Sequence, residues 1–312
     1  MSAELLNPMR GILLKLLSVV FFVAMQTCIK AVGDAAATGQ ITFYRSAFAM
    51  VPIFSYLAYR GALRTAFATA NPAGHLKRGV LGIVSMGLGF YGLVLLPLPE
   101  AIAIGYAMPL LAVVFAALLL HETVRVYRWT AVFFGMVGVM IISWPKLTLF
   151  QSEGFGSLAA LGVLAVLASA TLGALAQMQV RQLVGSEKTA TIVLYFSLTA
   201  AVFSLATIPF GWPHLSWNHA TLLIASGFLG GAGQILLTES YRQADVSTVA
   251  PFDYSSILLG IAISYFLFDE APTLTTIIGT VFVVSAGIFI IYREHKLGLE
   301  RRAAREAGAQ RV

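Results

Sequence analysis

The sequence predicts an all-α membrane protein of about ten transmembrane helices, organised as two inverted five-helix repeats. Three observations support this fold class. The chain is far more apolar than a soluble domain, and its apolar runs have the length of membrane-spanning helices. A short acidic motif also recurs at the ends of two of these runs, about 150 residues apart.

Composition separates this chain from soluble proteins. Hydrophobic residues make up 58% of the chain and charged residues 11%, and the mean hydropathy is +0.84. A soluble domain carries roughly a quarter of charged residues. The single cysteine, Cys28, excludes an intrachain disulfide and a multi-cysteine metal cluster, and we expect no metal or cofactor. Membrane topology and anionic lipid account for the net charge of +6, so we expect no nucleic-acid partner.

Apolar runs of near-membrane length follow one another along the chain. A helix needs about twenty residues to cross a hydrocarbon core of roughly 30 Å, and uninterrupted apolar runs favour helices over a closed barrel. The first run is longer than the apolar region of a signal peptide and has no small-residue cleavage site after it, so we expect a retained helix. The predicted spans are 10–30, 38–59, 77–96, 99–120, 127–144, 156–178, 187–210, 220–240, 246–268 and 273–292.

Two acidic pairs mark the internal repeat. His121-Glu122 and Asp269-Glu270 each close an apolar run, and a glycine-bearing apolar span follows each pair. A carboxylate at this position favours the positive end of the next helix dipole and can accept from its free amides, so we interpret Glu122 and Glu270 as structural. Five spans per half is an odd number, so the second half must enter the membrane inverted relative to the first.

The repeats suggest a division of the chain. We expect the boundary in the Gly/Ser-containing loop from Pro145 to Ser157. The first repeat would then cover 1–147, the second 148–295, and a basic cytoplasmic tail 296–312, either as a solvated helix or disordered.

Lysine and arginine positions predict the orientation. Cationic residues accumulate on the cytoplasmic side of bacterial membrane proteins. An arrangement with both termini in the cytoplasm leaves only Lys30 and Lys146 outside. The cationic residues of the inner loops are then Arg60, Arg64, Lys77, Arg78, Arg125, Arg128, Arg181, Lys188 and Arg242.

Charged residues inside spans are candidates for function, because an isolated charge there costs about 2.5 to 3.5 kcal/mol. Arg45 and Asp253 each lie about two turns into a span, and substrate binding, ion pairing and bonding to freed carbonyls all remain open for them. Glu239 and Glu100 are each either a protonatable coupling group or an interfacial residue that satisfies a helix end. Lys15 lies within reach of the inner interface, so we expect it to snorkel.

Tyrosines and glutamines in different spans form a second set of candidates. Tyrosine rings can stack on a planar ligand while glutamine amides bind its polar edge; the alternative for each is a contact between helices. This set is Gln26, Tyr91, Tyr106, Gln177, Gln234 and Tyr254. Glycines in the third and eighth spans, among them Gly87 and Gly231, predict either close helix contact or a cavity beside the backbone.

Several short motifs together resemble the drug/metabolite transporter superfamily, in its two-EamA-domain form. Their order along residues 10–293 is more specific than any one of them. They are Lys30 at the end of the first span, Phe43-Tyr44-Arg45, Pro97 to Ala101 leading to Pro109, His121-Glu122, Gly227 to Gln234 with Tyr241 to Ala244, and Ala250 to Tyr254 leading to Glu270.

A carrier built of two related halves is expected to work by alternating access, driven by the substrate gradient or by protons. The resemblance implies a ten-helix bundle with a central cavity, no ATP site, and export or exchange of small organic metabolites. It also implies a bacterial inner membrane and a small organic metabolite as substrate. For Lys30 it implies a role at the outer gate; a simple interfacial anchor is the alternative. The Pro251 to Tyr254 stretch is similar to alphaproteobacterial riboflavin and S-adenosylmethionine importers, with riboflavin the first expectation and S-adenosylmethionine import or amino-acid or drug export the alternatives.

Other classes have less support in the sequence. All five histidines fall in loops or at helix ends, and no metalloprotease motif or nucleophile elbow occurs, so a membrane-embedded enzyme is a distant alternative. We expect the partners to be a small-molecule substrate and the lipid bilayer, with protons as a candidate coupling ion, and the state to be a monomer or a weak homodimer.

Overall fold

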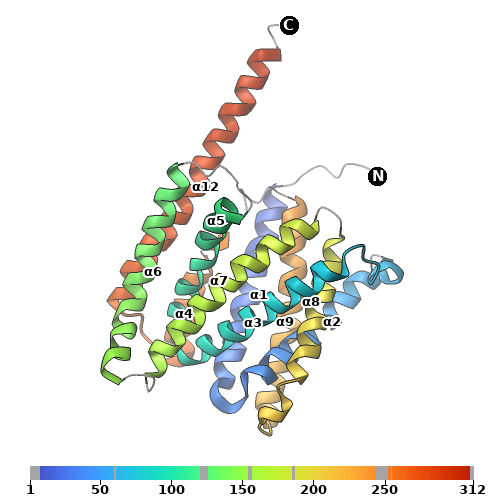
Figure 1. Cartoon of the computed structure of the whole chain (residues 1–312), viewed down its shortest axis with the longest axis vertical. Helices are drawn as coiled ribbons and strands as arrows, with labels where there is room; N and C mark the ends of the chain where they lie inside the picture. Colours follow the sequence, from blue (N-terminus) through green and yellow to red (C-terminus); the bar gives the residue numbers. More distant parts are fainter. Residues whose placement is uncertain are drawn as a thin grey trace.

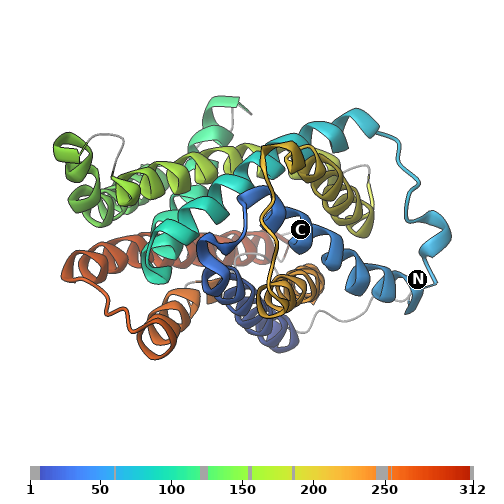
Figure 2. The same cartoon turned by 90° about the horizontal axis from the view of Figure 1, so that it is seen from below.

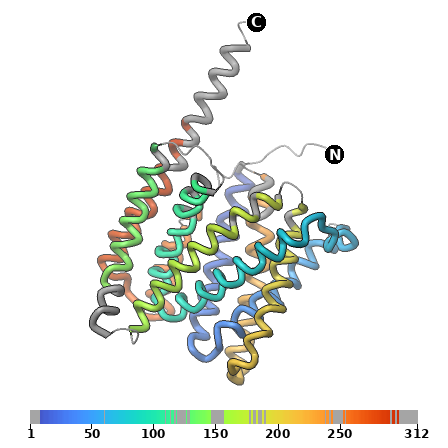
Figure 3. Tube along the Cα trace, in the orientation of Figure 1, coloured from blue at the N-terminus to red at the C-terminus, as the bar shows by residue number. Residues whose placement is uncertain are grey.

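The computed structural model describes residues 8–59, 61–119, 126–153, 157–184, 187–243, 252–253 and 255–309 (Figure 3). Every regular element within these residues is helical, so the all-α prediction is confirmed for them. The main helices are α1 (Pro8–Val32), α2 (Thr38–Tyr59), α3 (Pro72–Leu95), α4 (Leu98–Gly105), α5 (Ala107–Leu119), α6 (Val126–Glu153), α7 (Leu158–Val184), α8 (Thr189–Leu205), α9 (Trp217–Gln243), α11 (Ser255–Phe268) and α12 (Leu274–Ala309). Short 3₁₀ turns lie at Gly33–Ala35, Leu63–Thr65 and Ile208–Phe210.

Five helical segments are long and apolar enough to cross a membrane by length and composition. They are Met9–Ala35, Thr38–Tyr59, Pro72–Leu95, Leu158–Ala176 and Trp217–Leu237. Shorter apolar segments occupy the other predicted spans, at Leu98–Ala112, Trp129–Pro145, Ala190–Leu205, Ser255–Phe268 and Leu274–Phe289. The count of ten crossings stays a prediction.

The fourth predicted span is broken into two helices. α4 ends at Gly105 and α5 begins at Ala107, with Tyr106 between them. Pro109 has no backbone N–H to donate to the carbonyl of Gly105, four residues earlier, so a continuous α-helix is unfavourable here. The Tyr106 N–H instead bonds to the carbonyl of Ala103 at 3.3 Å, a tighter turn. The break sets Tyr106 at a bend in the chain.

Two other boundaries differ from prediction. α11 begins only at Ser255, so Asp253 lies in a short 3₁₀ turn before the helix and not two turns inside it. α6 continues through Pro145 to Glu153, so most of the predicted boundary loop is helical. In Figure 1, α12 extends past the rest of the bundle, so the predicted tail is helical as far as Ala309.

α1 packs along α9. Seen from below in Figure 2, α1 (dark blue) lies at one edge of the bundle beside α9, and it also contacts α3. α6 and α12 run side by side at one edge of the bundle (Figure 1). A buried apolar cluster that includes Ile29, Leu96 and Ile104 joins the central helices. Large apolar side chains such as Phe266, which is 79% exposed, cover the outer surface, as expected where lipid replaces water.

Glycines allow the closest helix contacts, as predicted. A Cβ atom added at Gly231 on α9 would lie 2.5 Å from Cγ of Pro52 and 2.6 Å from the carbonyl oxygen of Ala49, both on α2. α2 and α9 therefore touch through backbone, which only glycine permits at this position.

We expect Gly231→Ala to destabilise the protein by about 1–3 kcal/mol, because α2 and α9 must separate to admit the methyl group. The measurement is the thermal unfolding midpoint of the purified protein. Gly87→Ala is the matched control, since a Cβ atom at Gly87 on α3 would meet nothing within 4 Å. Equal midpoints for the two variants would contradict the packing argument.

Candidate functional site

A central cavity of about 500 Å³ lies among α1, α3, α4, α5, α7, α9 and the start of α11. Its lining is Lys15, Val19, Phe22, Val23, Gln26, Met86, Gly89, Phe90, Leu93, Ala101, Ile102, Gly105, Tyr106, Met108, Val166, Ser169, Ala170, Leu237, Asp253 and Ser256. Of the predicted site residues, the fold brings Gln26, Tyr106 and Asp253 to this cavity. These three come from distant parts of the chain, so only the fold assembles them.

A buried ion pair forms one wall of the cavity. Nζ of Lys15 lies 2.7 Å from Oδ1 of Asp253, with the Lys15 side chain 2% exposed and the Asp253 side chain 42% exposed. The predicted snorkelling of Lys15 was therefore wrong. An ammonium group so deeply buried needs a compensating charge, and Asp253 supplies it. Part of the carboxylate remains accessible to a molecule in the cavity.

Tyr106 connects the broken helix to the same wall. Its hydroxyl donates to the backbone carbonyl of Asp253 and lies 2.7 Å from Oγ of Ser256. The bend between α4 and α5 thus positions the tyrosine ring beside the cavity and ties it to the turn that carries Asp253.

The remaining lining is mostly apolar, and it includes two aromatic rings and two thioethers. Phe22, Phe90, Met86 and Met108 surround the space that the ion pair and Gln26 border. Aromatic rings and flexible thioethers accommodate a flat ring system, and an amide at the edge can bond its polar atoms. Sequence reasoning missed these four residues, because an apolar side chain in an apolar span carries no signal that distinguishes cavity from lipid.

Polar contacts close the bundle at the end where α1 and α3 finish. Nζ of Lys30 donates to the carbonyl of Leu96 and lies 3.6 Å from Oε1 of Glu270. Glu270 also accepts from the hydroxyl of Ser264 at 2.9 Å. Among the residues that the structure describes, the Glu270 carboxylate thus contacts side chains of α1 and α11, and not the amides of the following helix that we expected. Glu122 lies outside the described residues.

Glu100 strengthens the same closure. Its side chain is 2% exposed, and Oε1 accepts from the hydroxyl of Thr276 at 3.1 Å, so α4 is bonded to α12. The two expectations for Glu100, a protonatable coupling group and an interfacial residue at a helix end, both stay predictions. We call the contacts of Lys30, Glu270 and Glu100 the outer closure, after the side of the membrane that the sequence predicts for this end of the bundle.

Other predicted site residues lie away from the cavity. Glu239 accepts a hydrogen bond from the hydroxyl of Tyr56, and with Gln234 it borders a separate space of about 20 Å³, enough for one water molecule. Arg45 is buried on α2 at 7% exposure and does not line the cavity. Tyr91 is 39% exposed on α3 and is not brought to the cavity either. The side chain of Gln177, and all of Tyr254, lie outside the described part of the chain.

Comparison with known families decides what kind of protein carries this cavity. The profile of the EamA-like transporter family matches two segments, residues 9–144 and 160–293. The chain belongs to the EamA-like transporter family. It is therefore a multi-pass membrane transporter, and the family indicates a transporter rather than an enzyme.

Relatives of this EamA-like transporter are named for different substrates. The S-adenosylmethionine uptake transporter of Rickettsia prowazekii (strain Madrid E) is 26% identical, over 95% of this chain and 97% of the relative. The riboflavin transporter of Rhizobium johnstonii is 31% identical, over 81% of this chain and 80% of the relative. The pseudopaline exporter CntI of Pseudomonas aeruginosa (strain UCBPP-PA14) is 28% identical, over 89% and 94%. A crystal structure at 19% identity superposes with a TM-score of 0.63 over 92% of this chain and 98% of the other, which shows a shared fold.

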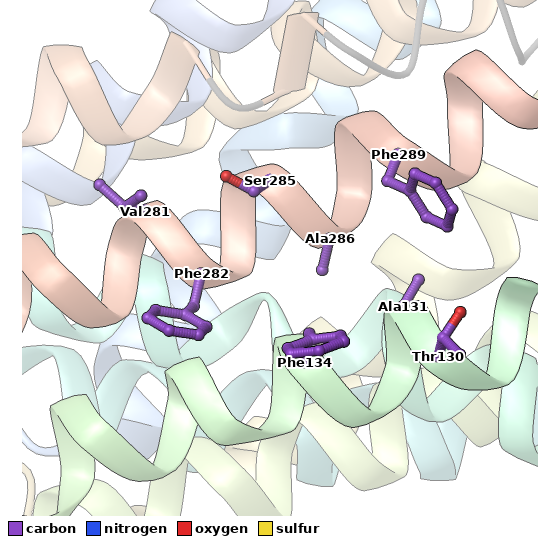
Figure 4. A pocket seen from close by; sticks show the side chains of 8 residues that line it. All are labelled: Thr130, Ala131, Phe134, Val281, Phe282, Ser285, Ala286 and Phe289. Carbon is purple, nitrogen blue, oxygen red and sulfur yellow. The ribbon is translucent and has the colours of Figure 1, made fainter.

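A second hollow of this EamA-like transporter lies on its outer surface. It has a volume of about 410 Å³ and is lined by side chains of α6 and α12. Figure 4 shows its lining side chains, among them Phe134, Phe282 and Phe289, contributed by these two helices. Among the described side chains, those that line it are uncharged, so they lack the groups that recognise a charged metabolite. We therefore place the candidate site in the central cavity.

The opposite end of the bundle has its own polar cluster. The Glu187 carboxylate accepts from the hydroxyl of Thr69 at 2.6 Å and from the backbone N–H groups of Ala70 and Asn71 at 2.7 and 3.0 Å. Nε2 of His75 lies 3.7 Å from the same carboxylate. The bond from Thr69, followed by the two amides and His75, holds the pKa of Glu187 below its ordinary value. This cluster joins the α2–α3 connection to the α7–α8 connection.

We expect the contribution of Glu187 to stability to depend on pH. Because its folded-state pKa is lowered, the contribution is complete above the ordinary glutamate pKa of about 4.3 and is lost as the pH falls through the lower folded value. Glu187→Gln should therefore lower the unfolding midpoint at pH 7 and make little difference near pH 3. Unfolding scans of both proteins between these values test this, and a difference that does not vary with pH would contradict it.

Proposed function

We propose that this transporter moves a metabolite with a zwitterionic amino acid head group and a flat ring system, and that S-adenosylmethionine, which also carries a sulfonium cation, is the first candidate. The Lys15–Asp253 pair supports this most directly. It places one positive and one negative group on the same wall of a cavity of about 500 Å³. An amino acid head group offers the two complementary charges, so the pair can exchange its internal bond for bonds to the substrate.

The ring-binding wall and the relatives support the same substrate. Phe22, Phe90 and Tyr106 offer surfaces for an adenine ring, and Gln26 offers an amide at its edge. Uptake transporters named for S-adenosylmethionine align with nearly the full chain. Riboflavin is the second candidate, because it has a flat ring system and is the named substrate of the Rhizobium relative. It is uncharged and needs no exchange with the ion pair, which is why we place it second.

Two related halves would supply the alternating movement. The two family matches support repeats at 1–147 and 148–295. Helix packing adds support: if α1 corresponds to α7 and α3 to α9, the observed α1–α9 and α3–α7 contacts are related to each other by exchange of the halves. The α2–α9 and α8–α3 contacts are related in the same way. A pseudo-two-fold axis in the membrane plane is the arrangement expected of inverted repeats.

The proposed cycle follows from the two ends of the bundle. In this conformation the outer closure joins α1, α3, α4, α11 and α12 beyond the cavity. Breaking the closure would expose the Lys15–Asp253 wall to one side of the membrane. Breaking the Glu187 cluster at the opposite end of the bundle would expose the same wall to the other side of the membrane. Protons are the proposed coupling ion, with Asp253 and Glu239 as the groups that would carry them.

We propose a bacterial inner membrane location with both termini in the cytoplasm. The two ends of the described chain lie at the same end of the bundle, which supports this orientation (Figure 1). In a Cys28→Ser background, Arg64→Cys is expected to react with an impermeant maleimide only from inside, and Lys146→Cys only from outside. Reversed labelling would invert the proposed topology.

Uptake by proteoliposomes tests the proposed substrate. Purified protein is reconstituted, and the initial rates of labelled S-adenosylmethionine and labelled riboflavin uptake are measured, with empty liposomes as the control. Saturable S-adenosylmethionine uptake that unlabelled S-adenosylmethionine competes away is the expected result. Riboflavin uptake alone would replace the first candidate by the second. Uptake of neither, together with no efflux from preloaded liposomes, would reject both.

A further inference from the structure

Arg45, which is buried, and Arg78, which is partly buried, share one aromatic ring at the opposite side of the bundle from α6 and α12. Cζ of Arg78 on α3 lies 3.9 Å from the centroid of the Phe196 ring on α8, and Cζ of Arg45 on α2 lies 6.0 Å from the same centroid. Since both distances refer to one ring, the two Cζ atoms lie within about 10 Å of each other. Neither arginine lines the central cavity.

The positive charges of these arginines have no matching anion among the residues that the structure describes. Nε of Arg45 and both Nε and Nη1 of Arg78 are buried without a hydrogen-bond partner. Within the same residues, neither side chain forms an ion pair with a carboxylate. Buried guanidinium nitrogens of two like charges, without a hydrogen-bond partner or a counter-charge, are unfavourable. Contact with the face of Phe196 offsets only part of this cost.

The guanidinium groups occupy space that is free because the neighbouring residues are glycines. A Cβ atom at Gly82 would lie 2.7 Å from Nη1 of Arg78 and 2.7 Å from the Phe196 ring. A Cβ atom at Gly230 on α9 would lie 3.3 Å from Nε of Arg45. Small residues on two helices thus admit both arginine heads to the space around Phe196.

We propose that Arg45 and Arg78 form a second binding site, separate from the substrate cavity, that takes an oxyanion of the phosphate type. A guanidinium group presents paired N–H donors whose spacing matches the oxygens of a phosphate, and two such groups neutralise its charge. Arg78 lies in the second turn of α3, near the end of the bundle that we propose to face the cytoplasm. The phosphate of an anionic lipid and free phosphate are the two sources of this chemistry.

A binding experiment on the full chain tests the site. Delipidated protein in detergent is titrated with sodium phosphate against sodium chloride of equal ionic strength, and the unfolding midpoint is followed by tryptophan fluorescence. The same midpoint is then compared between nanodiscs of phosphatidylglycerol and of phosphatidylcholine. We expect a specific rise in at least one of the two arms. A rise with phosphate identifies a free anion as the source, and a rise confined to phosphatidylglycerol identifies a lipid head group.

Variants separate this site from general charge attraction. Arg45→Gln and Arg78→Gln are each expected to weaken binding of the anion about ten-fold or more, because each removes a charge-assisted bond. The weaker binding is measured as a smaller rise of the unfolding midpoint. Lys77→Gln is the matched control, since it removes the same charge from the exposed residue next to Arg78 and should keep the response. If a glutamine variant does not fold, Arg45→Lys and Arg78→Lys replace it, with a smaller loss expected. No response of the wild-type protein in either arm, or equal losses in the Lys77 variant, would overturn the proposal.

Discussion

Asp253→Asn is expected to abolish transport, with initial uptake reduced about a hundred-fold or more while the protein remains in the membrane. The carboxylate is the charged partner of Lys15 at 2.7 Å, and Lys15 is 2% exposed. Neutralising Asp253 removes the negative charge 2.7 Å from that ammonium group, and it also removes the group proposed to receive the substrate amine.

A double variant distinguishes a binding role from a structural one. Lys15→Met/Asp253→Asn removes both charges, so no buried charge is left unpaired and the unfolding midpoint should recover. If the pair binds substrate, uptake stays lost in the double variant. Recovery of uptake together with stability would assign the pair to structure alone. Asp269→Asn is the control, because it makes the same chemical change at an exposed carboxylate.

Opening of the outer closure is expected in Lys30→Gln. The side chain of Lys30 bonds to the carbonyl of Leu96 and pairs with Glu270, so its charge holds α1 to both the α3–α4 and the α11–α12 connections. Loss of these charge-assisted contacts should shift the conformational equilibrium toward the outward-open state about ten-fold. The uptake rate should fall, because the carrier no longer returns efficiently to the closed conformation.

Thiol labelling measures this shift. Gln26→Cys in a Cys28→Ser background places a single thiol in the cavity lining. An impermeant maleimide added outside should label it slowly with Lys30 present and about ten-fold faster in Lys30→Gln. Asp34→Asn, an exposed charge at the same end of the bundle, is the control and should leave the rate unchanged. Equal labelling of all three proteins would show that Lys30 does not hold the closure.

Helix positions were predictable because they depend on hydrophobicity and length, which are local properties of the chain. α2 begins and ends where the second span was predicted, at residues 38 and 59. The break at Tyr106 was also within reach of the sequence, since Pro109 removes a helical hydrogen bond to Gly105. It was missed because the apolar run continues through the proline without a change in composition.

The site itself was only partly predictable. A charge in an apolar span draws attention to Lys15, Arg45 and Asp253, but the sequence does not say which of them meet. Lys15 and Asp253 pair across more than two hundred residues of chain, whereas Arg45 points to a different part of the bundle. Tyr91 and Tyr106 have equal claims by residue type, and only the fold leaves the first on the surface and brings the second to the cavity.

The sequence by itself determined that this chain is helical and built for a membrane, since its apolar content and the length of its runs leave no other way to satisfy the backbone in lipid. It also carried the resemblance through which the family was recognised. Only the tertiary structure decided which buried charges are paired, which aromatic side chains border the cavity and which end of the bundle is closed. These features depend on contacts between helices that are distant in sequence, and the periodicity of one helix does not specify the side chains of another.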